Sequence, residues 1–315
     1  MKMDFAVESW GAGYGFSGSS EEELDPFSDE IDCNVEPGLD DWKPIDPGLD
    51  GERPASIVFI DGIRRIDSRV WITDQGLARP GLCATVAAGA VRCTPDSAEV
   101  AASISRRGLY TAVGSAEPIT TTVGETYKVR PTSGDDDQAL SAGIQNHMTE
   151  LELDVSTQFD DETLVVFDGP LRGRDTVAGV GYIKTQHVQY LDADLQPVVG
   201  QLRAGQRTPI FSIGGAAPRW SWYMRLPGPI SHPMSGVVRL EVPQTGPADS
   251  AADRADQISK VLPRYASEAH KDQRAPQNLY PIAGLERELR RRLGDVHLLE
   301  RSLRVAGRRS GAQTT

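Results

Sequence analysis

The sequence predicts an α/β domain built on a mixed sheet, and three features of the chain support that expectation. Short apolar runs such as 57–60 and 164–167 are typical of buried strands. Between them, residues 139–157 carry apolar side chains at helical spacing. The overall order is a group of strands, a helix, more strands and then helices, and this order is typical of α/β domains.

The individual elements are expected in the following places. Apolar and β-branched runs predict strands at 55–60, 69–72, 81–93, 109–113, 164–167, 177–184, 209–213, 220–226 and 236–242. Helical periodicity predicts helices at 139–157, 251–269 and 282–305. In the strand at 220–226, Trp220, Trp222 and Tyr223 form either a stacking surface for single-stranded DNA or part of the core. The core is the simpler interpretation.

Charge and composition divide the chain into three parts. Residues 1–50 hold 14 acidic and 2 basic side chains and few branched apolar residues, so we expect a disordered or loosely docked acidic arm. Residues 51–309 are expected to form the folded domain, and residues 310–315 a short tail. The chain beyond residue 50 has 31 acidic and 31 basic side chains, so the net charge of -12 does not exclude DNA as a partner.

The two charged ends suggest a second role for the arm. The segment from Leu285 to Arg309 carries eight Arg against four acidic residues. An acidic arm and a basic helix attract each other at low salt, so the arm could compete with DNA for the basic surface. The simpler alternative is that the arm keeps the protein in solution.

Several classes of protein are excluded at this level. Cys33, Cys83 and Cys93 match neither a zinc spacing nor a disulfide framework, which favours a reducing cytoplasm. No apolar run has the length of a membrane span and no secretory signal is recognised, so a cytoplasmic protein without a membrane anchor is expected. Gly214-Gly215 lacks the lysine of a phosphate-binding loop. ATP hydrolysis by this chain is therefore not expected.

Two predicted strands end in the same dipeptide, Asp61-Gly62 and Asp168-Gly169. If the strands are neighbours, the two carboxylates converge, and their repulsion calls for a divalent cation. Oxygen ligands of this kind select Mg²⁺ or Mn²⁺, and two such ions can hydrolyse a phosphodiester. The structural alternative is that each Asp-Gly only marks a turn.

Further candidates surround these two carboxylates. Glu150 and Glu152 lie near the end of the helix at 139–157, and Glu152 borders its apolar face, so spacing favours Glu152 as a third ligand. Either acid could also belong to a solvated helix face. Cations near the strand ends could bind phosphate, although each could also be ordinary surface charge. They are Arg64, Arg65, Arg172, Arg174 and Lys184.

Four motifs, taken in this order, resemble the NurA nuclease family over residues 55–305. They are Phe59-Ile60-Asp61-Gly62, Phe167-Asp168-Gly169-Pro170-Leu171, Gly181-Tyr182-Ile183-Lys184-Thr185 and Asn278-Leu279-Tyr280-Pro281-Ile282. The resemblance implies an RNase H-like fold and DNA hydrolysis with Mn²⁺ or Mg²⁺. It also implies a homodimer that acts with a HerA-like hexameric DNA-translocating ATPase in DNA end processing, repair or phage defence.

The same resemblance assigns roles to individual residues. It places the catalytic acids at Asp61, at Glu150 or Glu152, and at Asp168, and it expects Tyr280 to contact DNA. The family carries a His on the helix after Tyr-Pro, where this chain has no His before His297. Glu288 is the expected substitute ligand.

Two other functions are consistent with the same residues. The missing His, and Ile63 in place of a small hydroxyl residue after Asp61-Gly62, would suit a catalytically degenerate RNase H-like scaffold that binds DNA or an ATPase ring. An actin-like or sugar-kinase fold also places Asp-Gly after strands. The absence of a glycine-rich phosphate loop argues against it.

Overall fold

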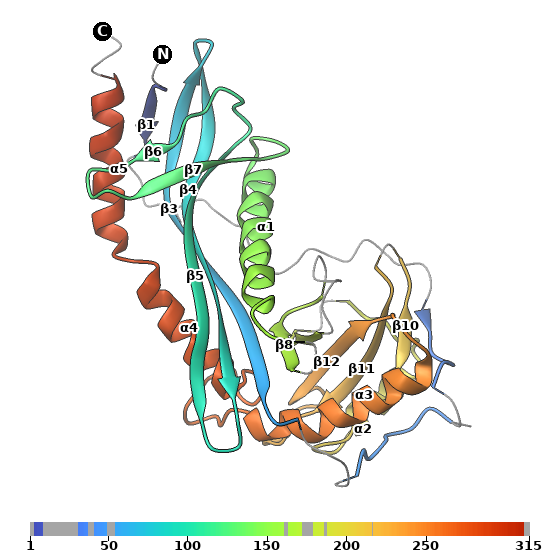
Figure 1. The fold of residues 1–315 in the computed structure, drawn as a ribbon. Helices are drawn as coiled ribbons and strands as arrows, with labels where there is room; N and C mark the ends of the chain where they lie inside the picture. Colours follow the sequence, from blue (N-terminus) through green and yellow to red (C-terminus); the bar gives the residue numbers. More distant parts are fainter. Residues whose placement is uncertain are drawn as a thin grey trace.

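Three long antiparallel strands form the spine of the sheet, and Figure 1 shows them running almost the full height of the molecule. They are β3 (Ile57–Asp74), β4 (Leu77–Cys93) and β5 (Ala98–Thr111). A tight turn joins β3 to β4, with Gln75 and Gly76 both at positive φ as a two-residue hairpin turn requires. This computed structural model describes residues 3–8, 31–36, 41–48, 54–160, 163–171, 179–185, 188–215 and 217–311.

The second half of the sheet is attached to β3 by parallel pairing. Strand β8 (Leu164–Asp168) runs parallel to β3, and β9 (Val180–Ile183) runs parallel to β8. The sheet then continues through antiparallel strands, which are β12 (Val237–Pro243), β11 (Arg219–Arg225), β10 (Phe211–Ile213) and β2 (Ile31–Asp32). At the other edge, β5 pairs with β7 (Thr126–Pro131), which pairs with β6 (Ile119–Thr120). The predicted α/β architecture with a mixed sheet is confirmed.

Helices cover both faces of this sheet. Helix α1 (Asp137–Ser156) packs through Leu140, Ile144 and Leu151 on one face. Helices α3 (Ala248–Val261) and α4 (Tyr280–Arg292) pack on the opposite face, as Figure 1 shows. The remaining helical segments are α2 (Gln196–Gln201), the 3-10 turn η1 (Leu262–Tyr265) and α5 (Val296–Gly311). No helix among the described residues is long and apolar enough to cross a bilayer.

Small residues in β4 let the helices approach closely. A side chain added at Gly89 would lie 3.0 Å from Leu285 Cδ1 on α4 and 3.0 Å from the carbonyl oxygen of Ala102. Ala87 and Ala88, on opposite faces beside it, are both fully buried. Because these side chains are short, α4 can pack close to the sheet. The position of an acidic side chain on α4 depends on this close packing.

Two stretches of the acidic segment 1–50, residues 3–8 and 31–36, lie against the fold. β1 (Phe5–Val7) pairs with β3, and Phe5 packs with Leu303 of α5 in one apolar cluster. β2 pairs with β10. Glu36 accepts two hydrogen bonds of 2.9 Å from the buried guanidinium of Arg207. These stretches are ordered because each finds an apolar or charged partner that composition alone cannot reveal.

The strand boundaries differ from the sequence prediction in one way that matters for the site. The strands expected at 55–60 and 69–72 are one strand, β3, because it stays paired with β4 from Ile57 to Asp74. Asp61-Gly62 therefore lies inside a strand rather than at its end. Gly169, by contrast, has φ of 106° directly after β8, so the second Asp-Gly does mark a turn.

Candidate active site

Asp61 and Asp168 lie next to each other on neighbouring parallel strands. The register pairs Phe59 with Val166 and Ile60 with Phe167, so the next step brings the two aspartates side by side. Phe59 and Val166 share the apolar cluster under α4, and side chains two residues further on each strand point to that same face. Two carboxylates thus meet where β8 ends and β3 continues.

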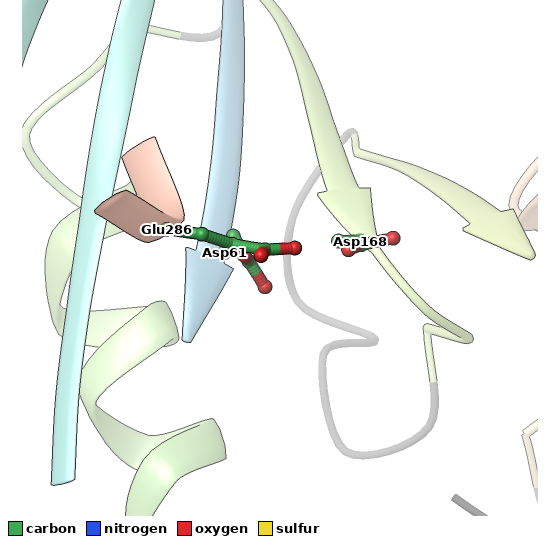
Figure 2. A group of neighbouring side chains, drawn as sticks. All are labelled: Asp61, Asp168 and Glu286. Carbon is green, nitrogen blue, oxygen red and sulfur yellow. The ribbon is translucent and has the colours of Figure 1, made fainter. Parts of the chain in front are cut away.

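A third carboxylate reaches this point from helix α4. Carboxylate oxygens of Asp61, Asp168 and Glu286 lie within 4.8 Å of one another, and Figure 2 shows the three side chains converging. We call these three residues the acidic cluster. Glu286 follows Leu285, whose side chain packs against the sheet beside Gly89, so the close helix contact fixes the direction of Glu286.

Glu152 approaches Asp61 from the helix on the other face. It is buried in α1, and its charge is one of the causes that raise the pKa of Asp61. Its Oε1 lies only 2.7 Å from the position that a Cβ at Gly62 would occupy. Gly62 therefore leaves the space that Glu152 fills. The glycine serves close approach and not a turn.

The electrostatics of the cluster are those of crowded negative charge. Burial, followed by the charges of Asp168 and Glu152, raises the pKa of Asp61 well above its ordinary value. Lys184 partly compensates, since its Nζ lies 2.6 Å from Asp168 Oδ2. Because these effects oppose ionisation of Asp61, a cation bound in the site would stabilise the ionised carboxylate.

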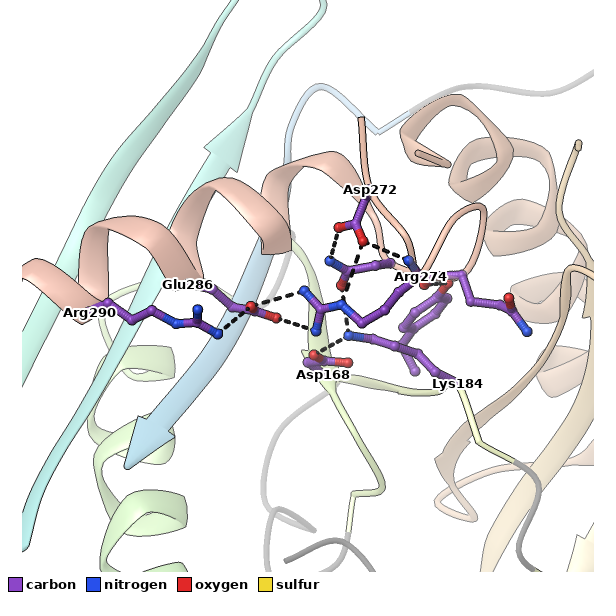
Figure 3. A network of polar contacts seen from close by, with 9 residues as sticks. Asp168, Lys184, Asp272, Arg274, Glu286 and Arg290 are labelled. Atoms are coloured by element: carbon purple, nitrogen blue, oxygen red, sulfur yellow. Dashed lines mark hydrogen bonds and ion pairs between the residues drawn. The ribbon is translucent and has the colours of Figure 1, made fainter. Parts of the chain in front are cut away.

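The segment before α4, residues 266–279, supplies the polar frame around the acidic cluster. Asn278, fully buried, accepts a hydrogen bond of 3.0 Å from Lys184 Nζ and donates one of 2.6 Å to Asp272 Oδ2. Arg274 donates to both oxygens of Glu286, at 3.0 and 3.1 Å. Figure 3 shows the network, in which Arg290 of α4 also reaches Glu286. Asp168 and Glu286 are thus each bound by a cation from another part of the chain, Lys184 and Arg274.

The donor set fits a hard divalent cation. All the charged donors are carboxylates, and oxygen ligands of this kind suit Mg²⁺ or Mn²⁺. In an octahedral Mg²⁺ site, opposite ligand oxygens lie about 4.2 Å apart, twice the usual bond length of roughly 2.1 Å. Neighbouring oxygens in such a site lie about 3.0 Å apart, so three oxygens within 4.8 Å of one another would each move inward by up to about 0.7 Å to close on one ion. Asp61, Asp168 and Glu286 are therefore the residues that could hold it, with Glu152 beside Asp61.

The other acidic residues expected in the site lie elsewhere. Glu150 is exposed on α1 and forms an ion pair of 3.0 Å with Arg130. Glu288 points away from the acidic cluster and pairs with Arg291 and Arg292 on the outer side of α4. On each helix the structure places the other glutamate, two residues away, at the site.

The expected phosphate-binding residues divide into three groups. Lys184 lies in the site, while the Arg64 guanidinium is directed to Gln145 of α1 at 2.8 Å. Arg65 donates to the carbonyl oxygens of Leu293 and Gly294 and to Asp67, so it ties β3 to the end of α4. Arg172 and Arg174 lie outside the described residues.

Tyr280 and the aromatic strand also have definite places. Tyr280 is half-buried at the start of α4, with Lys271 Nζ 5.0 Å from the centre of its ring. Trp220, Trp222 and Tyr223 are all buried in β11, and Trp222 donates to Ser259 of α3. The core interpretation of that aromatic strand is confirmed.

Glu286 and Arg274 are the site residues that sequence reasoning missed. Spacing favoured Glu152 because it borders the apolar face of its helix, and the same criterion applies to Glu286. It lies four residues after Ile282 and three before Leu289, both fully buried. No sequence pattern marks Arg274 in the same way. It lies in an irregular segment, and its partner Glu286 comes close to it only when the chain folds.

The chain matches one known family and is similar, at low identity, to two solved structures. The model of the NurA domain family matches residues 55–291. The NurA nuclease from Sulfolobus solfataricus is similar in structure at 11% identity and a TM-score of 0.48, covering 80% of this chain and 84% of that one. Endonuclease V from Bacillus subtilis is similar at 12% identity and a TM-score of 0.36, covering 83% and 85%. No curated relative matches. The family match extends over most of the chain, and the chain therefore belongs to the NurA domain family, a family of nucleases.

Proposed function

We propose that this protein is a metal-dependent deoxyribonuclease that hydrolyses phosphodiester bonds in DNA. The observation that carries the proposal is the convergence of Asp61, Asp168 and Glu286 from two strands and a helix, with their oxygens within 4.8 Å of one another. Burying several like charges together is unfavourable unless a cation joins them. We assign this activity to the domain at residues 51–309, which contains all the acidic residues of the proposed site.

The acidic residues would hold Mn²⁺ or Mg²⁺, with Glu152 providing the carboxylate that a second ion would need. Bound there, such ions lower the pKa of a coordinated water and neutralise charge on the phosphate. In the reaction, a water oxygen forms a bond to phosphorus, the bond to one sugar oxygen breaks, and that oxygen takes up a proton. Lys184, held beside Asp168 by Asn278, is placed to stabilise the negative charge that develops on the phosphate oxygens.

We infer the wider assembly from the family resemblance and from the chain itself. The described residues include no phosphate-binding loop, so DNA would be moved by a partner, for which a HerA-like hexameric ATPase is the proposed candidate. We propose a homodimer as the form that docks on such a ring. DNA end processing, repair or phage defence in the cytoplasm is the corresponding setting.

The direct test is digestion of linear single- and double-stranded DNA with Mn²⁺, Mg²⁺ or chelator. The proposal expects cleavage with metal and none with chelator, and loss of cleavage by at least about a thousandfold in Asp61→Asn and in Asp168→Asn. Glu99→Gln, in an exposed part of β5, is the control and should cleave like wild type. Cleavage that survives either aspartate substitution would remove that residue from the site.

A catalytically degenerate scaffold is the second candidate, and one observation favours it. Both oxygens of Glu286, a ligand in the proposal, already accept hydrogen bonds from Arg274. Such a scaffold would bind DNA or an ATPase ring without cutting. Salt-dependent DNA binding that is the same with and without metal, together with no cleavage, would support the scaffold over the nuclease.

A further inference from the structure

Arg274 holds a carboxylate of the acidic cluster with both arms of its guanidinium. Its Nη1 lies 3.0 Å from Glu286 Oε1 and its Nη2 lies 3.1 Å from Glu286 Oε2. This bidentate geometry is the strongest arrangement available to an arginine and a carboxylate. Arg274 is 55% exposed while Glu286 is 12% exposed, so the guanidinium covers the carboxylate on its solvent side.

One of these two oxygens of Glu286 also faces the point where a cation would bind. It lies within 4.8 Å of oxygens of both Asp61 and Asp168. A divalent cation on these oxygens and a guanidinium on the same carboxylate would repel each other at short range. The Glu286 carboxylate can therefore bind either Arg274 or the cation at full strength, but it cannot bind both in that way at once.

The backbone around Arg274 allows the side chain to move alone. The Arg274 backbone N–H donates to Asp272 Oδ1 at 2.8 Å, and Asp272 is in turn bound by the buried Asn278. Tyr182 Oη, from the sheet, donates to the carbonyl oxygen of Gln277 at 2.6 Å. These contacts fix the segment 272–278 to the sheet, whereas the Arg274 side chain is exposed, and its Nε lies 3.6 Å from Asp272 Oδ1.

We propose that Arg274 is a metal-released phosphate ligand. Without a cation it occupies Glu286; when a cation binds the acidic cluster, Arg274 leaves Glu286 and its guanidinium binds a phosphate of the DNA strand beside the site. Arginine suits this exchange because its planar fork fits a phosphate as well as a carboxylate. The inference rests on the proposed function and adds a coupling, in which metal binding creates part of the DNA surface.

The first measurement is Mn²⁺ binding by titration calorimetry without DNA. Wild type should bind Mn²⁺, and Arg274→Ala and Arg274→Gln should bind it about three- to tenfold more tightly, because the competing guanidinium is gone. Arg291→Ala, on the outer side of α4 and paired with Glu288, is the matched control and should match wild type. No Mn²⁺ binding by folded wild type would overturn the proposed function itself.

The second measurement is DNA affinity, by fluorescence anisotropy, in chelator and in Ca²⁺. The proposal expects Arg274→Ala to weaken binding about five- to tenfold in Ca²⁺ and less than about twofold in chelator. Arg291→Ala should show equal, small effects in both conditions. If wild type binds Mn²⁺ but Arg274→Ala changes DNA affinity equally in both conditions, or in neither, metal release is wrong while the nuclease proposal stands. Melting curves confirm that the variants fold.

Discussion

The carboxylate of Glu152 fills the space that a side chain at Gly62 would occupy. The two residues lie on different elements, α1 and β3, and a Cβ at Gly62 would come within 2.7 Å of Glu152 Oε1 and of Met148 Cγ. The glycine beside Asp61 thus leaves the space in which the buried Glu152 carboxylate lies next to the site. The glycine of the Asp61-Gly62 motif therefore determines how closely Glu152 of α1 can approach Asp61.

Gly62→Ala should therefore damage the site while leaving the fold in place. The added methyl group must push Glu152 and Met148 away, so we expect Mn²⁺ affinity to fall by about tenfold and cleavage with it. Calorimetry and a nuclease assay measure both. Gly284→Ala is the matched control, because no atom lies within 4 Å of its Cβ position and alanine favours the helix. Equal behaviour of the two variants would contradict the spatial role of Gly62.

Glu152 and Glu150, two residues apart on α1, should differ sharply. Glu152→Gln removes a buried charge near Asp61, so we expect cleavage to fall by about a hundredfold or more. Glu150→Gln removes only an exposed ion pair with Arg130 and should change stability by less than about 0.5 kcal/mol and cleavage by less than twofold. Steady-state cleavage rates decide between them, and a larger loss at Glu150 would reverse the assignment.

A second pair of glutamates provides the same comparison on α4. Glu286→Gln should weaken Mn²⁺ binding by about tenfold or more, because it removes one of three converging carboxylates. Glu288→Gln should leave Mn²⁺ binding unchanged, since Glu288 pairs with Arg291 and Arg292 away from the site. If Glu288→Gln is the damaging change, the helix presents a different face when metal is bound.

The raised pKa of Asp61 predicts how stability and metal binding depend on pH. In the folded, metal-free protein, Asp61 stays protonated at pH values above its ordinary pKa of 3.8. Its stability should therefore decline as the pH rises from about 4 through the raised pKa, because ionisation is easier in the unfolded chain. Asp61→Asn should reduce this decline and raise the melting temperature in chelator at pH 7 by a few degrees. Mn²⁺ affinity of wild type should increase over the same pH range, because metal displaces the proton.

Glu36 should stabilise the fold even though it belongs to the acidic segment. Arg207 is almost fully buried, with Glu36 and Asp256 as its ionic partners among the described residues. Glu36→Ala leaves that charge half-compensated, and we expect a loss of about 3 kcal/mol in the free energy of unfolding. Denaturant titration measures this loss. Asp41→Asn, exposed in the same segment, should cost almost nothing, and a Glu36→Ala cost as small as that would show that Glu36 does not stabilise the fold.

Much of the fold was predictable because its signals are local. The helix at 139–157 and the strand at 164–167 have patterns that need no distant partner, and both appear at nearly those bounds. The strand break after Asp61 was wrong, because an Asp-Gly pair is typical of turns while continued pairing of β3 with β4 depends on residues far along the chain. Likewise, the short strands at 5–7 and 31–32 exist through their partners.

By itself the sequence determined which residue types this protein offers for chemistry, namely aspartates after apolar runs and glutamates along apolar helix faces. Only the tertiary structure decided which of them meet. The parallel register of β3 and β8 joins Asp61 to Asp168, and the close contact of α4 at Gly89 selects Glu286 over Glu288. The physical reason is range: side-chain periodicity is a property of one element, whereas a cation site depends on distances between elements that only packing sets.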